Sequence, residues 1–236
     1  MKIIRFSQMG LVGNWRFDRG TGTTAKDSSP FGNNGTISGA SWVRGIFGSA
    51  LEFDGVDDYV DCGSDSSLTF GTSDFSWEGW FYLNDWTDDA SEQNSLITRG
   101  GASHTEDGFR TAVFNDGRIW TAISDGSFRT EIFTSAGLIK LHKWYHFAVV
   151  YDRDANGIVY INGENKKAVD ITGSNGSIST DRALRIGTWT PTQRLFNGKI
   201  DEVRIYNRAL TPKEIQIHFA FFKYIKPHPI IMRRKL

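Results

Sequence analysis

The chain has 236 residues, with 27 basic and 27 acidic side chains and a formal net charge of zero. This balance argues against a general nucleic-acid binder, whose domain is normally basic. The single cysteine, Cys62, excludes an internal disulfide and a cysteine-based zinc site, and no segment approaches the about 20 apolar residues of a membrane-spanning helix.

The N-terminal half contains several short apolar runs between polar turns. The first residues lack an uninterrupted apolar region and a cleavage site, so no classical signal peptide is expected. Residues 11–17, LVGNWRF, are predicted to form a strand, and 18–39 an ordered polar surface loop. Residues 50–60 contain two short strands around Asp54-Gly55, and FSWEGWFYL at 75–83 alternates as a strand does.

The second half continues with strands and glycine turns. An acidic loop at 84–94 is followed by a predicted meander at 95–98, 109–114, 118–124 and 128–133. WYHFAVVYDRDANGIVYING at 144–163 predicts a hairpin whose first strand is covered on both faces, because apolar residues occupy both. A strand at 184–187, a loop at 188–197 and a last strand at 199–206 complete the pattern.

One helix is predicted near the C-terminus. Thr211 is placed as N-cap, Pro212 as the first helical residue and Glu214 as the third, which forms a capping box. Strands spaced by about ten residues with one short helix predict an all-β, two-sheet antiparallel sandwich. Residues 1–217 are expected to be one domain.

The C-terminal tail, residues 218–236 (HFAFFKYIKPHPIIMRRKL), differs from the rest because it is both aromatic and basic. Three interpretations are open: packing over its own sheet, a docking arm for another subunit, or a membrane-surface anchor. Pro227 and Pro229 argue against a helix there and make the membrane interpretation the least favoured.

Four motifs occur in one order: LEFDGVDDYV, DFSWEGWFYL, KWYHFAVVYDRDANGIVYING and FNGKIDEVRIYNRALTPKEI. Together they resemble the laminin-G-like domains of the concanavalin A-like lectin/glucanase superfamily, over about residues 10–217. The resemblance implies a jelly roll of two antiparallel sheets. It says little about function, because this fold hosts lectins, adhesion modules, hydrolases and structural proteins.

The resemblance also implies a structural calcium ion between the N-terminal region and the last strand. Asp201 would be the anchoring carboxylate, and Asp18 and the turn at Asp54 and Gly55 would add oxygens, which are the ligands calcium prefers. The alternative is that Asp201 caps a turn or pairs with Arg204 or Lys199. Asp57 and Asp58 are weaker candidates, because adjacent strand residues point to opposite faces.

No catalytic arrangement is recognised, so an enzyme is not expected. The E-x-D-x-x-E string of glycosidases in this superfamily is absent, and Glu78 has no carboxylate partner on its own strand. Glu78 is therefore expected to be a polar residue on a solvent-facing sheet, and His146 a hydrogen-bonded core or sheet residue. A glycoside hydrolase would rest on fold analogy alone.

The candidate ligand-binding residues are aromatic and basic side chains in or near loops, because sugars stack on flat rings. They are Trp86, Arg99, Trp120, Trp189 and Arg194, with core packing as the alternative for Trp120. The first hypothesis is a non-catalytic recognition module that binds glycan or a protein surface. The second is a self-assembling structural protein of a virus or phage particle that uses residues 218–236. Either function places the chain on an extracellular surface or a virion.

Overall fold

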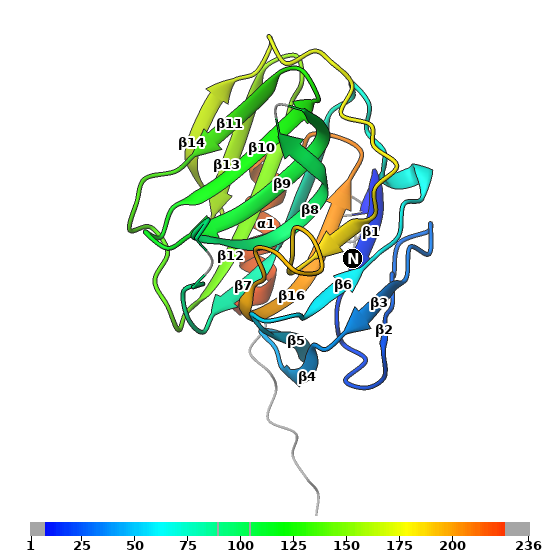
Figure 1. The fold of residues 1–236 in the computed structure, drawn as a ribbon, viewed down its shortest axis with the longest axis vertical. Helices are drawn as coiled ribbons and strands as arrows, with labels where there is room; N and C mark the ends of the chain where they lie inside the picture. The colour runs from blue at the N-terminus through cyan, green and yellow to red at the C-terminus, as the bar shows by residue number, and fades with distance from the viewer. Residues whose placement is uncertain (1–7, 89, 104, 225–236) are drawn as a thin grey trace, which may run out of the picture.

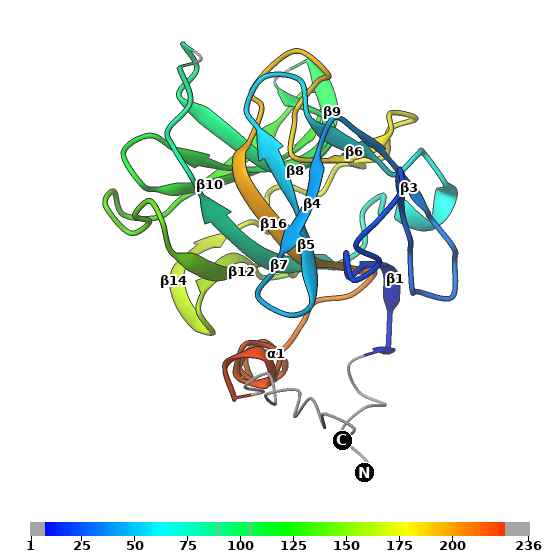
Figure 2. The ribbon, with the colours of Figure 1, turned by 90° about the horizontal axis from the view of Figure 1, so that it is seen from below.

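Two antiparallel sheets of eight strands pack face to face in the computed structural model, which describes residues 8–88, 90–103 and 105–224 (Figures 1 and 2). Sheet A runs, in order, through β14 (Glu164–Asp170), β13 (Asn156–Ile161), β12 (Trp144–Tyr151), β7 (Phe75–Leu83), β16 (Asn197–Tyr206), β5 (Ser49–Asp54) and β4 (Ser41–Arg44). Sheet B runs through β11 (Arg129–Phe133), β10 (Ile119–Asp125), β9 (Glu106–Phe114), β8 (Gln93–Ser103), β15 (Leu184–Ile186), β6 (Tyr59–Asp61), β3 (Gly35–Ser38) and β2 (Thr24–Ala25). The predicted all-β sandwich is confirmed.

Strand β16 organises sheet A. It pairs with β7 between Gly198 and Tyr206, while β5 and then β1 (Leu11–Trp15) share its other side. A β-bulge interrupts the pairing with β7 between Asp201 and Arg204, where Glu202 has a φ of 51°. Bulges re-aim side chains locally, and this one lies beside the predicted metal ligand Asp201.

The core lies between the two sheets and is rich in aromatic rings. Trp77 of β7 stacks on Phe109 of β9 at 4.7 Å between ring centroids, and Phe75 stacks on Tyr151 of β12 at 5.2 Å. All four rings are buried. Each such side chain contributes about 1.5–3 kcal/mol when removed from water, so these buried rings stabilise the sandwich, and the Trp77–Phe109 pair joins its two sheets.

The hairpin predicted at 144–163 is present as β12 and β13, with β12 paired to β7 on its other side. Phe147 and Val149 face the inter-sheet core, and Ala148 and Val150 face a smaller apolar cluster. Leu210 and Ile215 complete that second cluster from outside the sheet. The prediction that both faces of β12 are covered is confirmed.

Three stretches were predicted less well. Residues 18–39 contain the strands β2 and β3, and Ala25 and Asn33 there are buried. Asp27 holds this segment by accepting hydrogen bonds from the backbone N–H groups of Asn14, Ser29 and Asn33. Strands β4 and β14 were missed because both are edge strands with many polar residues, which weakens the alternation signal.

Helix α1 (Pro212–Tyr224) lies against the outer face of sheet A (Figure 2). The capping box is confirmed: Glu214 Oε2 accepts from Thr211 N at 2.9 Å, and Thr211 Oγ1 accepts from Glu214 N at 3.3 Å. The helix is longer than predicted, so residues 218–224 of the expected tail belong to it. Residues 225–236, the remainder of the proposed docking arm, lie outside the described residues. Within the described part of the chain, α1 is neither long nor apolar enough to cross a membrane.

Candidate functional site

Three of the predicted ligand-binding residues meet on the outer face of sheet B. Trp120 of β10 lies opposite Ala112 of β9 and Phe133 of β11, on the face that does not contact the inter-sheet core. Trp189 and Arg194 reach this face from the loop between β15 and β16, which passes in front of β8 in Figure 1.

Arginine side chains interleave with the two indole rings. The Arg110 guanidinium carbon lies 4.8 Å from the ring centroids of both Trp120 and Trp189. Arg194 lies 4.3 Å from Trp189, and Arg129 lies 5.2 Å from Trp120. We call Arg110, Trp120, Arg129, Trp189 and Arg194 the arginine–tryptophan cluster. Cation–π contacts of this kind hold ring and guanidinium in fixed relative positions.

The loop that carries Trp189 and Arg194 is itself fixed to the sheet. Trp189 N donates to the Gln193 carbonyl at 3.3 Å, which closes a tight turn. Arg194 adopts a left-handed backbone conformation, with a φ of 55°, and its carbonyl accepts from Ser95 N of β8 at 3.2 Å. The turn and this anchor place the Arg194 side chain over the Trp189 ring.

Positive charge dominates the cluster. Glu131 is the carboxylate bound within it, accepting from Arg129 at 2.5 Å and from Trp120 Nε1 at 2.7 Å. Arg110 donates instead to the neutral Gln93 amide at 2.5 Å. Burial, followed by repulsion from Arg194 and Arg129, lowers the pKa of Arg110 to about 9.

Several buried polar atoms on this face have no hydrogen-bond partner. They include Nε of Arg110 and of Arg129, Oγ of Ser95 and Oγ1 of Thr98. Ser95 lies opposite Ala112 and Thr98 opposite Arg110, so these atoms share the face of the arginine–tryptophan cluster. An unsatisfied buried polar group costs about 1–3 kcal/mol, which a bound polar ligand would relieve.

The other two predicted binding residues lie elsewhere. Trp86 packs half-buried against the inter-sheet core. Arg99 is buried and donates to the carbonyls of Ser64, Asp65 and Thr180, tying two loops together. Arg110 and Arg129 were missed by the sequence analysis, because arginines on a strand resemble an ordinary solvated face. Their register opposite Ala122 and Ser124, on the face of β10 that carries Trp120, would have indicated them.

Glu78 is buried beneath α1, so its predicted solvent-facing position is wrong. His218 of α1, Tyr206 and Arg204 all contact its carboxylate, and His146 Nε2 lies 3.6 Å from Oε2. Burial alone would raise the pKa of Glu78, but His218, His146 and Arg204 outweigh it and hold that pKa well below its usual range. This carboxylate serves as an internal polar contact.

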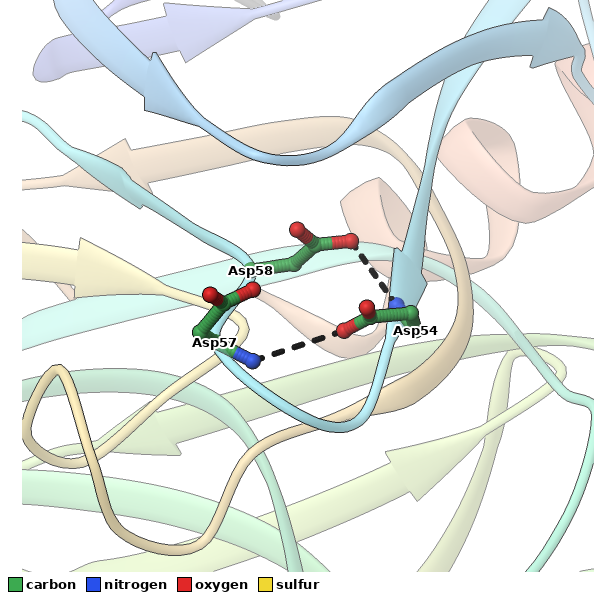
Figure 3. Close-up of side chains that lie close together, drawn as sticks. All are labelled: Asp54, Asp57 and Asp58. Carbon is green, nitrogen blue, oxygen red and sulfur yellow. Dashed lines mark hydrogen bonds between the residues drawn. The ribbon is translucent and has the colours of Figure 1, made fainter.

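The predicted metal ligands do not form one site. Asp54 and Gly55 lie at the end of β5 near Asn197, whereas Asp201 lies four residues further along β16, about 13 Å away at strand spacing. Asp54 instead groups with Asp57 and Asp58, with one oxygen of each within 4.8 Å of the others (Figure 3). The prediction that Asp57 and Asp58 point apart is wrong, because they belong to a turn.

The Asp54 group is largely occupied with holding its own turn. Asp54 Oδ1 accepts from Val56 N at 2.8 Å. It also accepts from Asp57 N at 3.4 Å, and Asp58 Oδ2 accepts from Asp54 N at 2.9 Å (Figure 3). Burial raises the pKa of Asp58 above its ordinary value. The carboxylates of Asp54 and Asp58 therefore hold the turn, and Asp57 takes part through its backbone N–H.

Asp18 and Asp201 approach one turn, at residues 45–48. Asp201 Oδ2 accepts from Ile46 N and Phe47 N at 3.0 and 3.3 Å. A Cβ atom at Gly45 would collide with Asp201, and one at Gly48 with Asp18, so glycine is needed at both positions. The predicted alternative for Asp201, capping a turn, is therefore observed.

Asp201 and Asp18 bring carboxylate oxygens to this turn, and such oxygens are ligands that calcium prefers. Burial and the neighbouring Glu202 carboxylate raise the pKa of Asp201 to about 9. Oε1 of Glu202 is buried without a hydrogen-bond partner, and Arg16 lies 3.6 Å from it. A cation would favour the ionised form of both carboxylates and use this free oxygen.

Comparison with solved structures finds several binding domains with this fold. The binding domain of Paraclostridial Mosquitocidal Protein 1 aligns with a TM-score of 0.75 and 17% identity, covering 90% of this chain and 52% of that chain. The botulinum neurotoxin serotype G binding domain aligns with a TM-score of 0.71 and 17% identity, covering 89% and 51%. This chain therefore spans about half the length of those toxin binding domains.

A third similar structure matches over nearly its whole length. Domain 4 of AbnA, an extracellular arabinanase from Geobacillus stearothermophilus solved in complex with arabinotriose, has a TM-score of 0.65 and 20% identity, with 89% of this chain and 98% of that chain covered. No curated protein matches the chain in a sequence search. The family model named Laminin_G_3 matches residues 54–216. The chain therefore belongs to this family, of the concanavalin A-like lectin/glucanases superfamily.

Proposed function

We propose that this protein is a non-catalytic binding module that recognises glycan or a protein surface through the outer face of sheet B. The observation that carries the proposal is the arginine–tryptophan cluster, in which half-buried Trp189, Arg129 and Arg194 surround buried Trp120 and Arg110. Binding sites combine fixed aromatic rings with a few convergent polar groups, and this face supplies both.

The comparisons support binding as the general class. The solved relatives include toxin binding domains and an arabinanase domain in complex with arabinotriose, and a related neurotoxin binding domain was solved with rat synaptotagmin II. One relative therefore holds a saccharide and another a protein. The present chain offers aromatic rings on which a saccharide can stack and charged groups that a protein surface can contact.

The arrangement of Glu78 supports the absence of catalysis. A glycosidase acid must reach the scissile bond, and a retaining pair of carboxylates lies about 5 Å apart around it. Glu78 is 1% exposed and is enclosed by His146, His218 and Arg204. It therefore acts within the fold, where it helps to hold α1.

The decisive experiment is a binding screen on arrays of glycans and extracellular proteins with wild type, Trp189→Ala and Trp86→Ala. Trp189→Ala should weaken binding at least tenfold, since truncating a central tryptophan of an interface costs about 2 kcal/mol or more. Trp86→Ala is the matched control, because Trp86 packs against the inter-sheet core. Loss of binding in Trp86→Ala alone would show that the binding site includes the loop at 84–94 instead. Unchanged binding in both variants would show that neither Trp189 nor Trp86 belongs to the binding site.

We also propose a structural calcium ion at the turn of residues 45–48. Asp201, Glu202 and Asp18 would hold it, together with carbonyl oxygens of the turn. The bound ion would neutralise carboxylates whose burial is otherwise unfavourable, and it would fix the segment after β1 to β16. Glu202 Oε1, which accepts no hydrogen bond within the described residues, and the glycines at 45 and 48 support this site over the Asp54 group.

A further inference from the structure

The electrostatics of the arginine–tryptophan cluster point to the chemical class of its ligand. The three guanidinium groups are those of Arg110, Arg129 and Arg194, and Glu131 is shared between Arg129 and Trp120. Arg110 makes its hydrogen bond to an uncharged amide. Three guanidinium groups are thus brought together on one face, and within the described residues no ion pair joins Arg110 to a carboxylate.

Part of this group of guanidiniums is buried away from water. Arg110 is 3% exposed, and burial together with Arg194 and Arg129 outweighs Glu106 and Glu131, so that its ionised form is disfavoured. Like charges in such a site repel strongly because the dielectric screening is weak. An anion bound here would convert this repulsion into attraction.

Donors are present to hold the anion. Nε of Arg110 and Nε of Arg129 have no hydrogen-bond partner, and the hydroxyl groups of Ser95 and Thr98 on the same face are also unpaired. Guanidinium groups bind carboxylate and sulfate oxygens in a planar, two-point geometry. Hydroxyl groups nearby suit the remaining oxygens of a saccharide.

Aromatic rings border the charged group. Phe133 is 36% exposed and lies beside Trp120 on the same face, with Phe114 at 6.1 Å between ring centroids. Arg118 lies over both phenyl rings, at 5.7 and 5.6 Å, but is paired with Asp116. A sugar ring can stack on such a surface, whereas an acidic peptide has no matching flat face.

From this juxtaposition we infer that the outer face of sheet B binds an acidic polysaccharide, with a carboxylate or sulfate group seated between Arg110 and Arg194 and a sugar ring on Phe133. The inference rests on the proposed function, since it concerns the same face. Beyond the proposed function, the inference specifies that the ligand is negatively charged and names the residues that select it.

The test is affinity electrophoresis of the full chain in native gels that contain polygalacturonate, dextran sulfate or neutral dextran. Wild type should be retarded by at least one acidic polymer, less so as sodium chloride rises, and not by dextran. Polygalacturonate and dextran sulfate distinguish carboxylate from sulfate recognition. A poly-glutamate gel tests the peptide alternative.

Arg194→Gln should weaken the apparent affinity for the retarding polymer about tenfold or more, since hydrogen bonds to charged groups are stronger than those between neutral groups. Arg44→Gln, an exposed arginine on β4 of sheet A, is the matched control and should bind as wild type does. Arg110→Gln should behave as Arg194→Gln does, provided that circular dichroism shows it folded. Because Arg194 is half-buried, its variant keeps the test decisive if Arg110→Gln unfolds.

Three outcomes would overturn the inference: no retardation by either acidic polymer, equal retardation by poly-glutamate, or unchanged binding in Arg194→Gln. Binding of a neutral glycan that is lost in Trp189→Ala, without retardation by acidic polymers, would leave the proposed function intact while refuting the charge selectivity. The two proposals therefore fail separately.

Discussion

Nδ1 of His218 lies 2.9 Å from Oε1 of Glu78, and this contact joins α1 to the middle of sheet A. The carboxylate also accepts from Tyr206 at 3.2 Å and from Arg204 at 3.3 Å. All of these side chains are largely buried, so each polar atom depends on its partners rather than on water. The helix is thus held by a charged network as well as by Leu210 and Ile215.

Glu78→Gln should destabilise the protein by about 3–5 kcal/mol, because it removes the buried carboxylate that His218, Tyr206 and Arg204 contact together. Chemical denaturation followed by fluorescence measures the free energy of unfolding. Glu164→Gln is the control, since Glu164 is exposed and paired with Lys166, and it should change stability by less than about 0.5 kcal/mol. Equal denaturation midpoints for Glu78→Gln and wild type would show that the network contributes nothing net.

The penalty of Glu78→Gln should depend on pH in a defined direction. The pKa of Glu78 is depressed in the folded state, so its contribution is fully present above its ordinary value of 4.5 and is lost as the pH falls through the folded value. The difference in unfolding free energy between wild type and variant should therefore shrink below about pH 4.5. A difference that grows on acidification would contradict the assignment of an ionised Glu78.

Truncation at two positions separates helix packing from any role of the tail. A chain ending at Ile217 loses His218 and half of α1, and its melting temperature should fall by about 10 °C, given a loss of about 3–5 kcal/mol. A chain ending at Tyr224 keeps His218 and should melt as the full chain does. If both truncations melt alike, the contact between His218 and Glu78 is not what holds α1.

Calcium should raise the melting temperature through the turn at residues 45–48. At a calcium concentration one hundred times the dissociation constant, binding stabilises by about 2.7 kcal/mol, or about 5–10 °C for a domain of this size. Asp201→Asn should abolish the shift, and Asp57→Asn should leave it unchanged. The reverse pattern would assign the ion to the Asp54 group instead, and differential scanning calorimetry with and without a chelator distinguishes the two.

Much of the fold was predictable because alternating strands and glycine turns are local signals. The hairpin of β12 and β13 and the capping box of Thr211 are encoded within a few residues. The missed strands β4 and β14 have weak local patterns and exist because a stronger neighbour pairs with them. Their formation depends on contacts that a single segment does not display.

The candidate site was predicted only in part, for a related reason. Trp120, Trp189 and Arg194 stood out by composition, but Arg110 becomes informative only when strand register places it between two indole rings. Glu78 could not be placed correctly, because nothing in its own strand indicates that a helix more than a hundred residues later covers it. Asp18 and Asp201, which the family resemblance grouped as metal ligands, both approach the turn at residues 45–48, whereas Asp54 belongs to a turn at the other end of β5.

The position of β16 in sheet A has a consequence for folding during synthesis on the ribosome. It lies between β7 and β5 and also pairs with β1, although it is synthesised after every other strand of the described residues. Until residues 197–206 emerge, sheet A is divided in two, and both β7 and β5 present unpaired edges that can join to other chains. A nascent chain that stalls before Asn197 will therefore be prone to aggregate, however well its earlier hairpins have formed.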